Sequence, residues 1–588
     1  MAVPSTEVLL ISVDGFSTYD VTSYVKSISV DRGRSRELDR FEAGTFSIAF
    51  ENRLRYFDPQ YTDSTFRTNF VKNPVPSTSA AVSPQESWQV LNRGTGGAGT
   101  TTLGSGGAVD TVTTAASTTA YSFGFTGSTN AQRVAVTAGQ TYAVSFYAIS
   151  SINDVRRLSG TFYDAAGSSL GEVNIGVAQS MTAGIEMRFT GTYTAPAGAV
   201  SMRVYAGATT GSVIRTLSST MTWRKALVEQ ASTIGTYFSG NDADNNYQTF
   251  SWTGATQSST STLLEYATPF YGLIVPNLGV SITTEGYGRI SGFIKDWNLL
   301  YDVSGESTAV AVGADAFSFL AQQETSASLS PSAETAGTRI NYMLSLSDVS
   351  WPYGGVQKSI NTTTTKQVQG HTIDAGTNIL EYCQLVERTE TGYFFVNQGG
   401  VIEFQKSGYE SLPGVTFTDN ESDIPYQSVE IVYGSELLYN VISLTRLGGA
   451  KQTVSRPTSI AAYGKSAYDD DGLLYVDNAA TLNAAQVLAA KYSLPEYRFD
   501  SVTVFLNPLS NANQQRVLGI DLASIISVRF TPNGVGSAIT KYARVNGISE
   551  KLDIDGHTIT FKLATIDNEV LTLDSNVFGL LDYNVLGF

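Results

Sequence analysis

The stretch Phe46-Ser47-Ile48-Ala49-Phe50 alternates strictly between large apolar and small residues. A period of two predicts a β-strand that buries Phe46, Ile48 and Phe50 on one face. Residues 8–13 and 27–30 also have strand composition, and a turn signal or a charged patch follows each of them. The chain therefore opens as a β-domain.

The composition of the sequence changes after residues 52–59. From about Asn69 to Ser261, Thr, Ser, Ala and Gly dominate, and short alternating runs are divided by turn signals, a pattern typical of a sandwich or jelly roll. After Pro269, strand patterns like those of the N-terminal residues return at 271–276, 288–294 and 310–313. We infer one β-domain interrupted by another, because surface loops tolerate insertions whose ends lie close together.

A few helices are expected to pack on this β framework. The apolar spacing predicts a short helix at 315–322 and longer helices at 378–388 and 478–492. Residues 392–404 are typical of a hairpin that turns at 397–400. The predicted fold class is mainly β with a few packing helices, interrupted by an inserted β-sandwich of jelly-roll type.

Length and charge exclude several kinds of protein. The chain has 588 residues, which is too long for one hydrophobic core, and its net charge is -16, which disfavours binding to a phosphate backbone. Its single cysteine, Cys383, allows no internal disulfide. Residues 1–15 do not have the pattern of a signal peptide, and no apolar run is long enough to cross a membrane, so we expect neither secretion nor a membrane span.

The residue types that carry chemistry are scarce or scattered. The two histidines, His371 and His557, lie in no recognisable catalytic motif, and with one cysteine they hardly provide a zinc site. Two suitably spaced carboxylates could still hydrolyse a glycoside, which sequence alone does not test. Residues 241–244 and 469–472 have the composition of calcium loops without EF-hand spacing, so each is a solvated turn or a cation site. We expect no enzyme, no cofactor and no metal.

The framework resembles the hub proteins of phage baseplates and the minor tail proteins of siphophages that infect actinobacteria. The order of several weak motifs carries this resemblance: Asn52 with Phe57-Asp58-Pro59, then residues 274–280, 291–297, 312–317, 392–404, 439–442 and 463–464. The resemblance implies hub-type β-barrel domains and a homotrimer that forms a ring around the tail channel at the distal tail tip of the virion. It also implies contacts with distal tail and tape-measure proteins, and synthesis in the host cytoplasm.

The inserted part is similar to the carbohydrate-binding jelly rolls found in such tail proteins. Its marks are Asn73-Pro74, Trp88, and residues 140–147, 162–167, 194–198, 226–229, 237–242 and 252–254, with Tyr247. Trp223-Arg224-Lys225 departs from the pattern, because the family has an acidic residue there. The resemblance implies a module that binds a host cell-wall glycan.

Four domains are predicted from these patterns. A first hub β-domain takes residues 1–65 and 266–328, and the carbohydrate-binding-like sandwich takes 66–265. A small α+β domain with the 378–388 helix and the 392–404 hairpin spans 329–415. A second hub β-domain with the 478–492 helix spans 416–588.

A glycan-binding face is predicted from strand parity. If Phe146, Phe162, Met202 and Val204 face the core, the side chains that point outward are Tyr147, Tyr163, Arg203 and Tyr205. Tyrosine rings stack on a pyranose and arginine donates to its hydroxyls, so these four residues are the candidate site. Trp88 and Trp223 are further candidates. Outward tyrosine is also ordinary in strands, and such residues can pack beneath a covering loop.

Two other functions stay open at this point. The chain could be a carbohydrate-binding adhesion protein with no hub role, or a tail-associated cell-wall hydrolase. In a hub, DNA passes through the channel without being specifically bound, so the channel surface is expected to be neutral to acidic.

Overall fold

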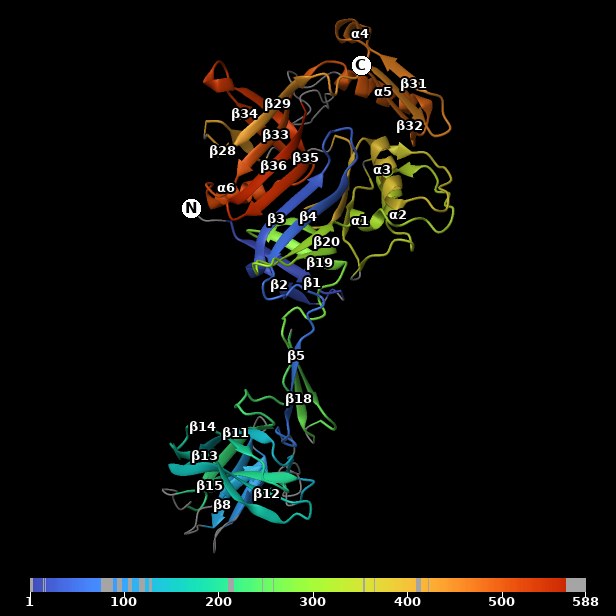
Figure 1. Cartoon of the computed structure of the whole chain (residues 1–588). Coiled ribbons are helices and arrows are strands. Elements are labelled where there is room, and N and C mark those ends of the chain that lie inside the picture. Colours follow the sequence, from blue (N-terminus) through green and yellow to red (C-terminus); the bar gives the residue numbers. More distant parts are fainter. Residues whose placement is uncertain are drawn as a thin grey trace. The chain divides into compact units, whose positions relative to one another are not determined.

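The computed structural model describes residues 4–566, except residues 14, 16, 76–87, 92–97, 104–107, 116–121, 126–128, 210–215, 246, 257–258, 353–354, 364, 409–413 and 421. The chain forms two compact units (Figure 1). Unit 1 consists of Met1–Pro59 and Gly272–Phe588, and unit 2 is Gln60–Tyr271. The finer division into four domains stays a prediction.

A large mixed sheet is the framework of unit 1. Among the described residues it holds 14 strands, and its main path runs β2-β1-β19-β20-β21-β4-β3-β35-β34-β27-β28, while β36 pairs with β35 and β33, and β33 pairs with β29. The strands are β1 (Thr6–Ile11), β2 (Thr18–Asp20), β3 (Val25–Gly33), β4 (Glu42–Glu51), β19 (Leu278–Thr284), β20 (Tyr287–Leu300), β21 (Thr308–Ala314), β27 (Thr416–Thr418), β28 (Ile424–Pro425), β29 (Ser428–Gly434), β33 (Glu496–Phe505), β34 (Ile525–Phe530), β35 (Ile539–Asp553) and β36 (Gly556–Thr565). Strands from the two ends of the sequence therefore lie side by side, because β3 pairs with β35 (Figure 1).

The mainly β class is confirmed, but the described strands close no barrel of the expected hub type: their pairing forms an open, branched sheet. The branch is at β35, whose 15 residues exceed the length of its neighbours. Its first half pairs with β34 and its second half with β3, while β36 runs along its other edge. In β4 the alternation has the expected result, since Phe46, Ile48 and Phe50 are all buried.

Six helices and three small sheets complete the described part of unit 1. The helices are α1 (Phe317–Leu320), α2 (Ala336–Met343), α3 (Ile379–Glu390), α4 (Pro457–Tyr463), α5 (Asn478–Tyr492) and α6 (Asn511–Leu518), with short 3-10 turns at Thr22–Tyr24 and Pro532–Gly534. The small sheets pair β22 (Glu334–Thr335) with β24 (Gln367–Val368), β23 (Lys358–Ile360) with β26 (Ile402–Gln405) and β25 (Tyr393–Val396), and β31 (Gln452–Ser455) with β30 (Val441–Arg446) and β32 (Ala467–Leu473). No helix in the described part has the length and apolar character needed to cross a membrane.

Capping residues fix the ends of the two helices that matter for the site. The Asn378 side chain accepts from the backbone N–H of Glu381 at the start of α3, and Thr391 ends the helix in the left-handed conformation with φ 57°. The Asp477 side chain accepts from the N–H of Ala480 at the start of α5.

One predicted strand is absent: residues 271–276 form a turn instead. Gly272 has φ 70° there, and Pro276 offers no backbone donor.

Unit 2 is a sandwich of two antiparallel sheets with a small third sheet. One sheet holds β6 (Trp88–Leu91), β9 (Ser122–Phe125), β10 (Val134–Ala135), β12 (Asp154–Tyr163), β13 (Ser169–Met181) and β15 (Ser201–Ala208), and the other holds β7 (Ala98–Leu103), β8 (Val109–Ala115), β11 (Thr141–Ser150), β14 (Glu186–Thr194) and β16 (Thr220–Glu229). Phe146, Phe162 and Trp223 are buried between these sheets.

The third sheet of unit 2 holds the two ends of the unit together. It consists of β5 (Ser64–Asn69), β17 (Gln248–Trp252) and β18 (Ser261–Tyr266), and β5 pairs with β18 from Ser64↔Tyr266 to Asn69↔Ser261. Asn69 is buried and donates to the carbonyls of Ala226 and Phe238, which fixes this sheet to β16. The chain therefore enters and leaves unit 2 along adjacent strands.

Candidate functional site

Three of the predicted sugar-face residues come together on one sheet of the sandwich. Thr161 on β12 lies opposite Arg203 on β15, and Tyr163 lies opposite Ser201. Because Phe162 and its neighbours on β15 face the core, Tyr163, Arg203 and Tyr205 lie on the other face of the same sheet. The hydroxyls of Tyr205 and Thr161 are 3.0 Å apart on this face.

An arginine that the sequence reasoning missed completes the cluster. The guanidinium carbon of Arg133 is 3.4 Å from the centroid of the Tyr163 ring, and that of Arg203 is 5.5 Å from it. Burial lowers the pKa of Arg133, and the nearby positive charge of Arg203 lowers it further. We call Arg133, Tyr163 and Arg203 the arginine–tyrosine cluster. Arg133 directly precedes β10, which pairs with β15, and this pairing brings it to the cluster.

The cluster is much less exposed than strand parity predicted. Tyr163 is 8% exposed and Tyr205 is fully buried. Parity decides which face of a sheet a side chain occupies, but it does not decide how much of that face stays open to solvent. The expectation of an exposed Tyr205 is therefore wrong, and only Tyr163 and Arg203 keep some access among the three.

The other predicted residues do not join this cluster. Tyr147 is on β11, in the opposite sheet, where the charged groups of Arg188 and Lys225 lie 5.5 and 5.4 Å from its ring centroid. Trp223 is 1% exposed and packs in the sandwich core with its ring centroid 4.9 Å from that of Phe146, so the prediction of a sugar contact there is wrong. The backbone of Trp88 is in β6, and its side chain lies outside the described residues.

The two candidate calcium loops have ordinary partners. Asp242 and Asp244 accept from the backbone N–H groups of Ser239 and Phe250. Asp469 pairs with Lys451, and Asp470 pairs with Arg388. Each of these four carboxylates therefore accepts a backbone hydrogen bond or pairs with a basic side chain.

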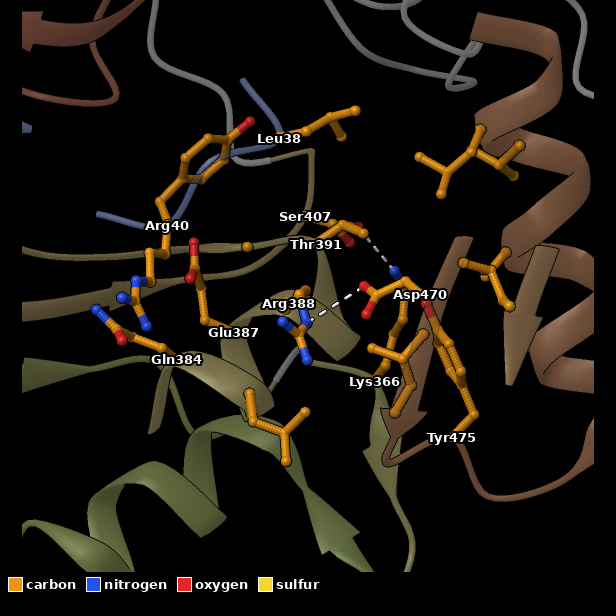
Figure 2. Close-up of a pocket in the computed structure, with 18 of the residues that line it drawn as sticks. Leu38, Arg40, Lys366, Gln384, Glu387, Arg388, Thr391, Ser407, Asp470 and Tyr475 are labelled. Atoms are coloured by element: carbon orange, nitrogen blue, oxygen red, sulfur yellow. Dashed lines mark hydrogen bonds and ion pairs between the residues drawn. The ribbon is translucent and has the colours of Figure 1, made fainter. Parts of the chain in front are cut away.

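A second candidate site is a large cavity in unit 1, between α3 and α5 (Figure 2). Its volume is about 1050 Å³, and it is lined by α3, α5, β32, the segment 34–40, and parts of segments 366–367, 391–393 and 407–408. Apolar side chains of both helices face it together with several tyrosines. Apolar walls with a few charged groups are the usual lining of a ligand pocket.

Ion pairs and buried charges are concentrated along one wall of the cavity. Arg388 Nε is 3.2 Å from an Asp470 carboxylate oxygen, a contact drawn in Figure 2. Burial raises the pKa of Asp470, against the opposing effect of the Arg388 charge. The pKa of Glu387 is raised to about 8 by burial, although Arg34 lies 3.8 Å away.

Lys366 also lines the cavity, and its ammonium group already has hydrogen-bond partners. Its ammonium donates to the Glu390 carbonyl at 2.6 Å and to the Thr391 hydroxyl at 3.1 Å. Burial lowers the pKa of Lys366, while Glu390 opposes that shift. Among the described lining residues there is no histidine or cysteine, so the cavity offers binding surface and charge rather than a nucleophile with a neighbouring imidazole base.

Comparison with known proteins gives likenesses of fold at low identity. No family model matches the chain, and no curated protein matches it. Its structural neighbours are phage tail proteins and carbohydrate-binding modules.

Three of these neighbours illustrate the two groups. A tail protein from Neisseria meningitidis MC58 is 13% identical, with 53% of this chain and 87% of that chain covered and a TM-score of 0.37. A prophage MuSo2 43 kDa tail protein from Shewanella oneidensis is 14% identical, with coverage of 50% and 84% and a TM-score of 0.36. A CBM22-1 xylan-binding domain from Paenibacillus barcinonensis is 12% identical, with coverage of 29% and 97% and a TM-score of 0.20.

Proposed function

We propose that this protein is a structural subunit of a phage tail tip, with unit 1 as the hub framework and unit 2 as a glycan-binding module. The framework motifs in residues 1–65 and 266–588 support the hub role. The observation that carries the binding role is the arginine–tyrosine cluster, where Tyr163 lies within reach of two guanidinium groups on the outer face of a sandwich sheet. Because the Tyr163 ring is largely covered, it is suited to holding the two guanidinium groups in place, and these are suited to donating hydrogen bonds to the polar groups of a sugar.

The charge of the cluster favours an acidic glycan over a neutral one. Arg133 and Arg203 repel each other in a partly desolvated setting, and an anion placed between them relieves that repulsion. A guanidinium also pairs with carboxylate or phosphate in a bidentate geometry that a neutral hydroxyl does not offer. We therefore expect a host glycan that carries carboxylate or phosphate groups.

Adsorption of the full-length chain to host cell walls tests the binding role. Arg203→Gln removes one charge of the cluster and keeps a polar side chain, and Tyr163→Phe keeps the ring. We expect Arg203→Gln to reduce adsorption at least several-fold and Tyr163→Phe to have a small effect. Tyr147→Phe on the opposite sheet is the matched control. Equal adsorption by wild type and Arg203→Gln would exclude this cluster as the binding site.

The hub role predicts self-association into a trimer that surrounds the tail channel. Light scattering of the purified chain should then give three times the monomer mass of 62.9 kDa. A strictly monomeric protein at high concentration would favour the alternative of an adhesion protein with no hub role.

We further propose that the protein acts without catalysis, as a virion component that contacts distal tail and tape-measure proteins. Incubation with purified cell walls should then release no new reducing ends or amino groups. Release of either product by the wild type would establish the alternative of a tail-associated hydrolase.

A further inference from the structure

Helix α5 has two apolar stripes, one buried and one only partly covered, since Ala480, Ala484 and Leu488 pack at the edge of a hydrophobic cluster while Val487 does not. Thr481, Ala485, Ala489 and Tyr492 are buried, and α5 packs on β30 and β31. A second stripe, Ala480, Ala484, Val487 and Leu488, faces the cavity. Val487 in this stripe is 37% exposed. A helix that is apolar on two sides is expected to be covered on both.

Helix α3 provides the opposite wall. Leu385 of α3 and Leu38 of the segment before β4 line the cavity together with the second stripe of α5. No described element fills the groove between α3 and α5, whose volume of about 1050 Å³ is large enough for a peptide segment.

The described chain ends near this groove. Ile566 is 3% exposed, and its N–H donates to the Tyr542 carbonyl on β35 at 3.1 Å. Arg544 lies two residues further along β35, on the same face as Tyr542, and its guanidinium is 4.8 Å from the centroid of the Tyr393 ring. Tyr393 lines the cavity. Only a short length of chain therefore separates Ile566 from the cavity wall.

The sequence that follows has the composition of a buried segment. Residues 567–588 lie outside the described residues, and half of them are large apolar or aromatic: 570, 571, 573, 577, 578, 580, 581, 583, 585, 586 and 588. The same stretch has four acidic residues and no basic one. At about 3.3 Å per residue, a stretch of this length spans the groove with ease.

We propose that residues 567–588 dock in the groove between α3 and α5 of the same chain. Docking covers the second stripe of α5 and removes the apolar side chains of 567–588 from water, at about 25 cal/mol for each Å² buried. Attachment at Ile566 favours this contact, because a tethered segment has an effective local concentration in the millimolar range. Arg34 and Arg40 line the groove and offer basic partners to an acidic segment, beside the acidic lining residues Glu37, Asp39 and Glu381.

Photocrosslinking in the full-length protein tests this assignment. A benzophenone amino acid replaces Val487 in the groove, and in the matched control it replaces Tyr463, an exposed residue of α4. Mass spectrometry of a mixture of isotope-labelled and unlabelled protein then identifies the captured peptide and whether it belongs to the same chain. We expect position 487 to capture a peptide within residues 567–588 of its own chain and position 463 to capture none. Capture of a peptide from a second copy, or of none, overturns the proposal.

A truncation gives an independent measurement. Removal of residues 567–588 is expected to increase amide hydrogen exchange in α5 at least tenfold. The amides of β12 in unit 2 should be unchanged, which shows that the truncated protein is folded. Unchanged exchange in α5 would contradict the docking of this segment.

Discussion

A buried ionic cluster joins β20, β35 and β36, and its disruption should be costly. Glu550 on β35 accepts from Arg289 Nη2 at 2.6 Å and from Arg289 Nε at 3.0 Å. The Nε2 atom of His557 on β36 lies 3.0 Å from the second Glu550 oxygen. The three side chains are at most 4% exposed. Glu550→Gln therefore leaves the Arg289 charge buried without its counter-ion.

The magnitude follows from the pKa of Glu550. Burial by itself raises this pKa, but the charge of Arg289 and the contact with His557 lower it from 4.5 to about 2. A lowered folded-state pKa stabilises the protein above pH 4.5, and this stabilisation is lost as the pH falls through 2. The shift corresponds to about 3 kcal/mol at neutral pH, and breaking one partner of a buried pair costs about 3–5 kcal/mol.

Hydrogen exchange of the full-length protein at pH 7 measures this cost. Peptides from β35 and β36 should lose about 3 kcal/mol of protection in Glu550→Gln. Lys551→Gln, which removes the neighbouring exposed pair with Asp553, is the control and should exchange like the wild type. The double variant Arg289→Met, Glu550→Leu should recover most of the loss, because it removes both charges. Wild-type protection in Glu550→Gln, or no recovery in the double variant, would refute the reasoning.

Three further predictions concern the core, the pH dependence and the insertion. Trp223→Ala should destabilise unit 2 by about 3–5 kcal/mol through a cavity in the sandwich core, measured by urea denaturation. The pKa of Glu387 is about 8 in the folded protein and 4.5 when unfolded, so the free energy of unfolding should fall as the pH rises from 4.5 through 8. Glu387→Gln should abolish this loss of stability, measured by urea denaturation at pH 5 and at pH 9. Replacement of residues 60–271 by a short linker should leave a unit 1 that still melts cooperatively, measured by calorimetry.

Local periodicity predicted the elements whose own residues decide their structure. The alternation in β4 gave both the strand and its buried face. The spacing at 478–492 gave the bounds of α5, because Asp477 caps it and the whole segment is a good helix former. Helix α2 was not predicted, although its N-cap Thr335 is a recognisable start signal.

The candidate site was only partly predictable, because it depends on which distant segments meet. Parity placed Tyr163 and Arg203 on one face, but Arg133 joins them through the pairing of β10 with β15, which no local pattern specifies. Tyr147 has the same parity on a strand of the other sheet. The cavity between α3 and α5 could not be predicted from the sequence at all, because it is formed by helices about a hundred residues apart.

The pairing of β5 with β18 explains why an insertion of this size is compatible with the framework sheet. The two strands pair along their whole length, so unit 2 begins and ends at adjacent points and closes its own connection. The strands that flank the insertion, β4 and β19, meanwhile keep their partners in the large sheet: β4 pairs with β3 and β21, and β19 with β1 and β20. Changes on the proposed sugar-binding face of unit 2 therefore need not disturb the pairing of unit 1. In the proposed tail tip, this separates the choice of host glycan from the architecture of the ring.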